Sequence, residues 1–142
     1  MATTDTRALR PSVRERAQGQ CEYCLLPEEA DFTRHEVDHI VAEQHGGKTT
    51  LENLAYACFD CNKYKGPNIA SIDPHTGERT WLFNPRTQQW DEHFLLDKDG
   101  VITGLTIEGR ATARLLHLND PERVQDRVGL LMIGTLHSTQ RQ

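Results

Sequence analysis

Residues 21–24 read Cys-Glu-Tyr-Cys, and residues 58–66 read Cys-Phe-Asp-Cys-Asn-Lys-Tyr-Lys-Gly. These two stretches hold all four cysteines of the 142-residue chain. A gap of two residues lets both sulfur atoms of a pair reach one ion, and two such pairs complete the tetrahedral shell that zinc prefers. We therefore predict one structural zinc, because a shell of four thiolates leaves no open position for catalysis. Its ligands would be Cys21, Cys24, Cys58 and Cys61.

The alternative for these cysteines is a set of unrelated buried or redox-active thiols. A thioredoxin-like Cys-x-x-Cys needs a surrounding strand-helix-strand pattern, which is missing here. The first residues, Met-Ala-Thr-Thr-Asp-Thr, lack the apolar segment of a signal peptide, and no apolar run is long enough to span a membrane. We therefore expect a cytoplasmic protein without membrane association, whose reduced thiols are available to a metal.

Composition limits the size of the core and the range of partners. A chain of 142 residues fits one compact domain, or one small domain with an extension. Hydrophobic residues make up 37% and aromatic residues 6%, so the core is modest and a structural metal would help the first half fold. The formal net charge of -5 counts against simple electrostatic capture of a nucleic acid, although bound divalent cations would offset part of it.

The first half shows the order strand, strand, helix. Residues 11–18 are predicted to form a short helix that Gly19 ends, and residues 32–40 have strand character. A turn at 44–48 leads to a second strand at 54–57, and a helix from Phe59 to Lys65 ends at Gly66-Pro67. This order predicts an α+β fold.

The second half differs from the first in its predicted elements. Residues 73–77 are predicted to form a turn and 81–83 a strand, while 90–96 and 101–107 form a hairpin around residues 97–100. Two helices follow, over 110–118 and from Pro121 onward, with Asp120 as the N-cap of the second. We divide the chain into a leader with a short helix (1–20), a core (21–66) and a hairpin and two-helix extension packed on that core (67–142).

Several spaced elements lie between and after the cysteine pairs. They read Val37-Asp38-His39-Ile40, Gly46-Gly47 and Asn53-Leu54, and then Asn62 and Lys65-Gly66 beside the second pair. In this order and spacing, residues 21–66 resemble the HNH endonuclease family. The resemblance implies a small ββα-metal core, and with it nuclease activity, in addition to the four-cysteine zinc.

The resemblance also implies roles for individual residues. Asp38 and Asn62 correspond to ligands of a catalytic divalent cation, Mg²⁺ or Mn²⁺, which prefers oxygen donors. His39 corresponds to the general base, since an imidazole accepts a proton from water near neutral pH. Asn53 corresponds to the residue that bridges the loop and orients that histidine; on its own it fits a turn or a cap equally well. Asn62 replaces the last histidine of the family name, which favours harder metals.

We therefore expect an HNH-type endonuclease that cleaves DNA with one divalent cation, with RNA left open as a substrate. Lys63 and Lys65 follow Asn62 and either contact phosphates or form a solvated helix face. The rival interpretations are a non-catalytic zinc-knuckle module that binds nucleic acid and a protein-interaction module. The oligomeric state does not follow from the sequence.

Other conspicuous residues carry no assigned chemistry. His35 either supports a residue of the site from behind or is a plain exposed strand residue, and we expect the latter. We expect the aromatic side chains of the second half to belong to a core rather than to stack on bases. Those aromatic residues are Trp81, Phe83, Trp90 and Phe94. The stretches at 84–86, 90–94 and 109–112 resemble the C-terminal extension of some small bacterial HNH proteins.

Overall fold

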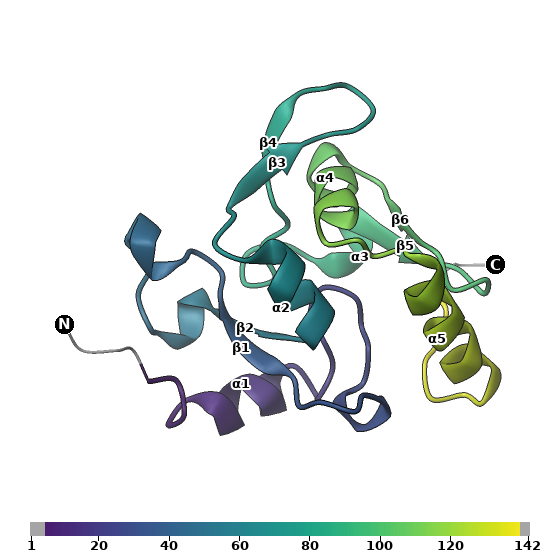
Figure 1. Ribbon diagram of the computed structural model, residues 1–142, viewed down its shortest axis with the longest axis horizontal. Coiled ribbons are helices and arrows are strands. Elements are labelled where there is room, and N and C mark those ends of the chain that lie inside the picture. The colour runs from purple at the N-terminus through teal and green to yellow at the C-terminus, as the bar shows by residue number, and fades with distance from the viewer. Residues whose placement is uncertain (1–4, 140–142) are drawn as a thin grey trace. The chain divides into compact units, whose positions relative to one another are not determined.

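The computed structural model describes residues 5–139, and the chain divides into two compact units at the boundary between Ile69 and Ala70 (Figure 1). Both units combine helices with two-stranded antiparallel sheets, which confirms the predicted α+β class. Within residues 5–139, no helix has the length and apolar character needed to cross a membrane.

The first unit is built around a ββα arrangement. Strands β1 (Glu36–His39) and β2 (Leu54–Ala57) pair antiparallel, and helix α2 (Phe59–Lys65) packs against both. The cap of α2 comes from the cysteine motif itself, because the Cys58 sulfur accepts the N–H of Cys61. Helix α1 (Arg10–Arg16) begins with a proline in its first turn and also packs against β2. Three short 3₁₀ turns, η1 to η3, complete this unit at Glu28–Ala30, Glu43–His45 and Leu51–Asn53.

The core of this unit forms between α1 and β2. Val13, Leu54 and Tyr56 are fully buried there, and four partly buried apolar residues pack around them. All four residues of β2 are buried because helices α1 and α2 both pack against this strand. Burying each Val or Leu side chain contributes about 1.5–3 kcal/mol, so this small cluster alone supplies limited stability.

Strand β1 is shorter than its predicted range of 32–40. Glu36 pairs with Ala57, the last residue of β2, and the chain then turns at Cys58 into α2. Residues before Glu36 therefore find no partner on that strand, and Phe32 is fully exposed. The strand propensity of Phe32 does not decide its conformation, because the cysteine motif ends the neighbouring strand.

The second unit contains two hairpins and three helices. Strands β3 (Ala70–Ile72) and β4 (Arg79–Trp81) form one hairpin, and β5 (Phe94–Leu96) and β6 (Ile102–Gly104) form the other. The helices are α3 (Trp90–His93), α4 (Ile107–Leu115) and α5 (Pro121–Met132). The hairpin around residues 97–100 and the two final helices were predicted, although residues 90–93, which were expected in a strand, form α3. The first hairpin was not predicted: its turn at 73–77 was expected, but β3 was missed, and the strand expected over 81–83 lies at Arg79–Trp81 as β4.

Conspicuous residues of the second unit have structural roles. Arg110 of α4 binds Asp73 through two hydrogen bonds of 2.9 and 2.8 Å, and Thr112 accepts the backbone N–H of Phe83. Thr106 caps α4, and its hydroxyl also lies 2.6 Å from Nδ1 of His93. These contacts give residues in the stretches at 90–94 and 109–112 structural roles that involve no catalysis.

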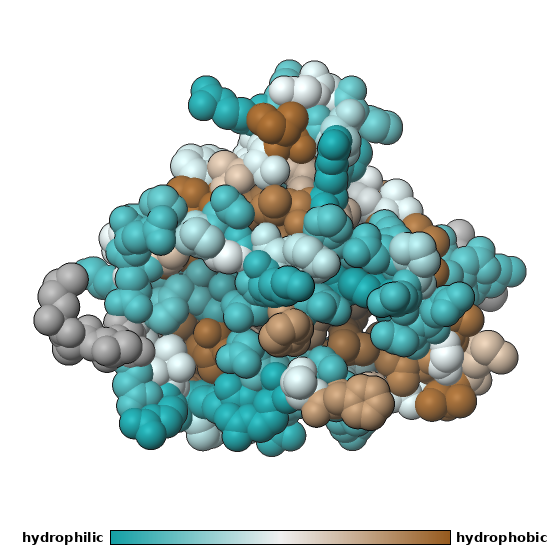
Figure 2. All heavy atoms as spheres, viewed as in Figure 1, coloured by the Kyte–Doolittle hydropathy of each residue, from teal (hydrophilic) through white to brown (hydrophobic). Residues whose placement is uncertain are grey.

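The expected aromatic core is only partly correct. Phe83 and Phe94 are buried, and Trp90 stacks near Phe94 with ring centroids 5.1 Å apart. Trp81, in contrast, is 69% exposed. It is the last residue of β4, which belongs to a two-stranded hairpin, and no described part of its own unit covers this side chain. Figure 2 shows apolar residues, in brown, among mostly polar residues, in teal, on the face in view.

Helix α5 differs from the apolar face that the spacing of Val124, Val128, Leu131 and Leu136 predicts. Its buried residues are Arg123 and Arg127, whose guanidinium groups donate to backbone carbonyl groups at 116–118 and at Gly100. Leu136 is buried but lies beyond the last helical residue, Met132. The helix is therefore held by buried arginines that satisfy carbonyl groups, in addition to apolar contacts.

Candidate active site

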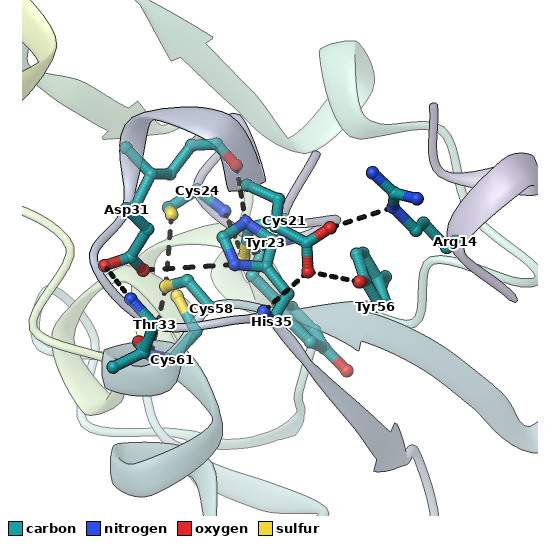
Figure 3. A network of polar contacts seen from close by, with 12 residues as sticks. Arg14, Cys21, Tyr23, Cys24, Asp31, Thr33, His35, Tyr56, Cys58 and Cys61 are labelled. Atoms are coloured by element: carbon teal, nitrogen blue, oxygen red, sulfur yellow. Dashed lines mark hydrogen bonds and ion pairs between the residues drawn. The ribbon is translucent and has the colours of Figure 1, made fainter. Parts of the chain in front are cut away.

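The four cysteines meet in the interior of the first unit. Their sulfur atoms all lie within 4.8 Å of one another, and the Sγ atoms of Cys24 and Cys58 are 3.6 Å apart. Figure 3 shows these sulfur atoms gathered beside His35 and Tyr23. Four Zn–S bonds of about 2.3 Å in a tetrahedron place the sulfurs roughly 3.8 Å apart, which matches this cluster. All four cysteines lie in the described part of the chain, and none forms a disulfide.

The backbone around each pair prepares the sulfur atoms for a metal. Cys21 Sγ accepts the N–H groups of Tyr23 and Cys24, each at 3.4 Å, and Cys58 Sγ accepts that of Cys61 at the same distance. Burial raises the pKa of the Cys21 and Cys61 thiols well above the ordinary value. Ionising a buried thiol therefore costs free energy, and a thiophilic cation offsets that cost because it binds the thiolate directly. The cluster therefore fits a structural zinc with a closed shell.

A second group of polar side chains borders an open pocket of the first unit. Asp38 and His39 come from the end of β1, and Asn62 comes from the middle of α2. Glu43, in the turn that follows β1, borders the same pocket and was not predicted. Two adjacent strand residues normally point to opposite faces. Here His39 is the last residue of its strand, and both neighbours border one pocket.

Asp38 is buried and contacts two donors. Its Oδ2 accepts the hydroxyl of Tyr23 at 3.0 Å, and the Lys65 ammonium lies 3.2 Å from the same oxygen. Burial raises the pKa of Asp38 above its ordinary value, while Lys65 and Tyr23 act in the opposite direction. The carboxylate is thus held in one orientation by two donors.

His39 is half-buried and contacts the turn that follows β1. Its Nε2 lies 2.8 Å from the hydroxyl oxygen of Thr49. This contact restrains the rotation of the ring and leaves the second ring nitrogen, Nδ1, for other partners. Thr49 was not singled out in the sequence, because a threonine in a polar turn carries no signal of its own.

Asn53 closes the loop between β1 and β2. Its Oδ1 accepts the N–H of Val41, and its Nδ2 donates to the carbonyl groups of Val41 and Lys48, all at 2.9 Å. Gly47 lies directly against this bridge, since an added Cβ would fall 1.7 Å from the Val41 carbonyl oxygen. The side chain of Asn53 therefore bridges the loop that carries Thr49.

Comparison with known proteins gives one match. Residues 21–68 match the model of the HNH endonuclease family, over the same segment that contains both the cysteine cluster and the pocket. This segment is an HNH domain. Its family indicates nuclease activity in general. No curated protein and no solved structure matches the chain.

The two lysines of the HNH domain lie in different environments. Lys63 is exposed on α2, and its ammonium lies 5.3 Å from the centre of the Tyr64 ring. Lys65 is 1% exposed, and its ammonium binds Asp38 and the carbonyl oxygens of His39 and Ile40. The expected contact of Lys65 with phosphate is therefore not supported: its three N–H donors already have buried acceptors.

His35 also differs from expectation. It is completely buried, with Nε2 2.8 Å from the Leu26 carbonyl oxygen and Nδ1 3.9 Å from Asp31 Oδ2. Its ring packs at 5.4 Å from that of Tyr56, and Figure 3 shows it between Asp31 and the tyrosine. Its isolated position in a polar stretch gave no sign of burial. The side chain supports the loop that leads into β1.

Proposed function

We propose that the HNH domain hydrolyses DNA phosphodiester bonds, with His39 as the general base and with Asp38 and Asn62 as ligands of one Mg²⁺ or Mn²⁺. One observation carries this proposal: these three side chains border a single pocket, although they come from β1 and α2. The family match over residues 21–68 supports phosphodiester chemistry in general.

The donor atoms suit a hard cation. A carboxylate and an amide oxygen are the ligand types that Mg²⁺ and Mn²⁺ accept. When bound, such a cation would supply positive charge for the phosphate and the leaving oxygen. Two protein ligands leave most of an octahedral shell to water and substrate, so we expect weak binding in the absence of a phosphate. The expected products carry 5′-phosphate and 3′-hydroxyl ends.

His39 is suited to remove the proton from the attacking water. When its Nε2 donates to the Thr49 hydroxyl, 2.8 Å away, the lone pair remains on Nδ1. An imidazole in this form accepts a proton near neutral pH, and a positioned base of this kind contributes roughly 10²–10⁴-fold to the rate. Asn53 supports the same geometry indirectly, because it bridges the loop that carries Thr49.

Binding of the substrate needs additional positive charge. Lys63 is exposed on the same helix as Asn62, one residue further along, and is the candidate for a phosphate contact. Lys65 is omitted from this role because of its burial. With a formal net charge of -5, we expect DNA binding to depend on divalent cations.

The same net charge favours a second candidate function, a zinc-containing module that binds a protein and cleaves no nucleic acid. Such a module needs no general base and no site for a hard cation. The two functions therefore differ in one observable property, which is metal-dependent turnover.

Incubation of supercoiled plasmid with the purified protein separates the two. The nuclease proposal predicts nicked or linear DNA with added Mg²⁺ or Mn²⁺, and none with a chelator that leaves the structural zinc bound. Zn²⁺ in place of Mg²⁺ is expected to be a poor activator, since it favours tetrahedral nitrogen and sulfur sites. Intact plasmid under all metal conditions would favour the binding module, and cleavage after removal of all free divalent ions would contradict the proposed mechanism.

A further inference from the structure

We propose that Tyr23 is a positioning residue. Its hydroxyl orients Asp38 for the catalytic cation, and its backbone is held by the cysteine cluster, so the cluster helps to position that carboxylate. This inference rests on the proposed function, because it concerns the same cation. It assigns a role to a residue between the two cysteines of the first pair, a position at which only the cysteines carry a sequence signal.

The cysteine cluster fixes the backbone of Tyr23. The residue lies inside the first pair, and its N–H donates to the sulfur of Cys21 at 3.4 Å. Its side chain is 1% exposed, so the ring has little freedom to move. A metal held by the cysteines therefore fixes the backbone position from which the Tyr23 side chain extends.

The other end of Tyr23 reaches the pocket. Its hydroxyl donates to Asp38 Oδ2 at 3.0 Å, and Asp38 borders the pocket together with His39 and Asn62. Tyr23 thus spans the distance between a sulfur of the predicted zinc site and a carboxylate of the predicted cation site. Both of its contacts are buried, where a hydrogen bond to a charged group is stronger than in water.

Asp38 needs such a restraint. A carboxylate has about four acceptor positions, so it can accept two donors and still bind a cation. Lys65 supplies the second restraint, but its ammonium is divided among Asp38 and two carbonyl oxygens. The Tyr23 hydroxyl carries a single proton and donates it to Asp38 Oδ2. Loss of that proton would leave the orientation of the carboxylate to Lys65.

The substitution Tyr23→Phe removes one hydroxyl and leaves the ring. Groups that orient a metal ligand typically contribute about 10–100-fold to metal affinity. We therefore expect Tyr23→Phe to weaken Mn²⁺ binding roughly tenfold or more, with the zinc content unchanged. In plasmid cleavage, the Mn²⁺ concentration for half-maximal rate should rise by a similar factor, and the rate should recover at high Mn²⁺.

Tyr56→Phe is the matched control. It also removes a buried tyrosine hydroxyl from the first unit, but the contacts of that hydroxyl are with Glu28 and Arg10. A purely structural effect of losing a hydroxyl would appear in both variants as a lower unfolding temperature. An effect through Asp38 appears in the Mn²⁺ affinity of Tyr23→Phe alone.

The test is a Mn²⁺ titration of the zinc-loaded full chain, followed by electron paramagnetic resonance of free Mn²⁺, for wild type, Tyr23→Phe, Tyr56→Phe and Asp38→Ala. We expect binding in wild type and Tyr56→Phe, weaker binding in Tyr23→Phe and none in Asp38→Ala. Equal affinity of wild type and Tyr23→Phe, with loss in Asp38→Ala, would overturn this inference and leave the proposed function standing. Affinity in Asp38→Ala equal to wild type, or no binding in any protein, would overturn the cation site itself.

Discussion

At the scale of single residues, the site depends on contacts that residue types do not reveal. The resemblance to the HNH family predicted Asp38, His39, Asn53 and Asn62, and three of these residues border one pocket. Lys65 and His35 were expected at the surface and are buried. Burial follows from tertiary contacts, such as the carbonyl oxygens that surround the Lys65 ammonium, and a lysine in a polar helix gives no local sign of them.

Thr49 provides a test of how His39 is oriented. Thr49→Val removes the hydroxyl 2.8 Å from Nε2 and keeps the shape of the side chain. One neutral hydrogen bond contributes about 1 kcal/mol, so we expect cleavage to slow roughly 5–10-fold. Thr50→Val is the control, since Thr50 is exposed and its side chain makes no capping bond. Equal rates for wild type and Thr49→Val would show that this contact does not orient the base.

At the scale of elements, the cysteine motif determined the best predictions. Helix α2 spans Phe59–Lys65, as predicted, because Cys58 caps its start and Gly66-Pro67 follows its end. Strand β2 was also predicted over its observed range. Strand β1 was predicted too long and the β3–β4 hairpin was missed, because pairing partners decide both and local propensity does not.

The loop between β1 and β2 depends on the bridge that Asn53 forms. Asn53→Ala removes three hydrogen bonds, so we expect the Val41 amide to exchange with solvent at least roughly tenfold faster, since each bond contributes about 1 kcal/mol. The rate of plasmid cleavage by Asn53→Ala should also fall. Asn68→Ala, which loses one bond to the Lys65 carbonyl group, is the control. Unchanged exchange at Val41 in Asn53→Ala would argue against the bridge.

The cysteine cluster joins segments that are far apart in the sequence. We expect one tightly bound zinc per chain and the loss of structure over at least residues 20–66 when Cys61→Ser removes one ligand, because metal binding and folding are coupled in small sites. Elemental analysis and far-ultraviolet circular dichroism measure these two effects. Purified protein without zinc or another thiophilic metal would contradict the assignment.

At the scale of the whole molecule, the predicted chemistry lies in the first of the two units. Residues 21–68 contain the family match and all the predicted chemistry, while the second unit is held by its own core and ion pairs. How the extension packs on the HNH domain stays a prediction. The stretches at 84–86, 90–94 and 109–112 carry no assigned chemistry, and two of their residues, His93 and Thr112, make structural contacts within the second unit.

The ion pair between Asp73 and Arg110 predicts how the stability of the second unit depends on pH. The hydrogen bonds from Arg110 hold the pKa of Asp73 well below its ordinary value of 3.8. Because the folded-state pKa is lowered, this stabilisation is present above about pH 4 and is lost as the pH falls toward the folded-state value. Thermal unfolding should therefore show a lower midpoint for Asp73→Asn at pH 7, and the difference from wild type should shrink below about pH 4. Asp99→Asn, on an exposed turn, should show no difference at either pH.

The rate of plasmid nicking by His39→Ala measures whether His39 is the catalytic base of a metal-dependent nuclease. His45→Ala is the matched control, because His45 is an exposed histidine of the same loop. With Mg²⁺ present and the zinc content equal in all three proteins, we predict that His39→Ala nicks roughly 10²–10⁴-fold more slowly than wild type and that His45→Ala is unchanged. Nicking by His39→Ala at the wild-type rate would contradict the account.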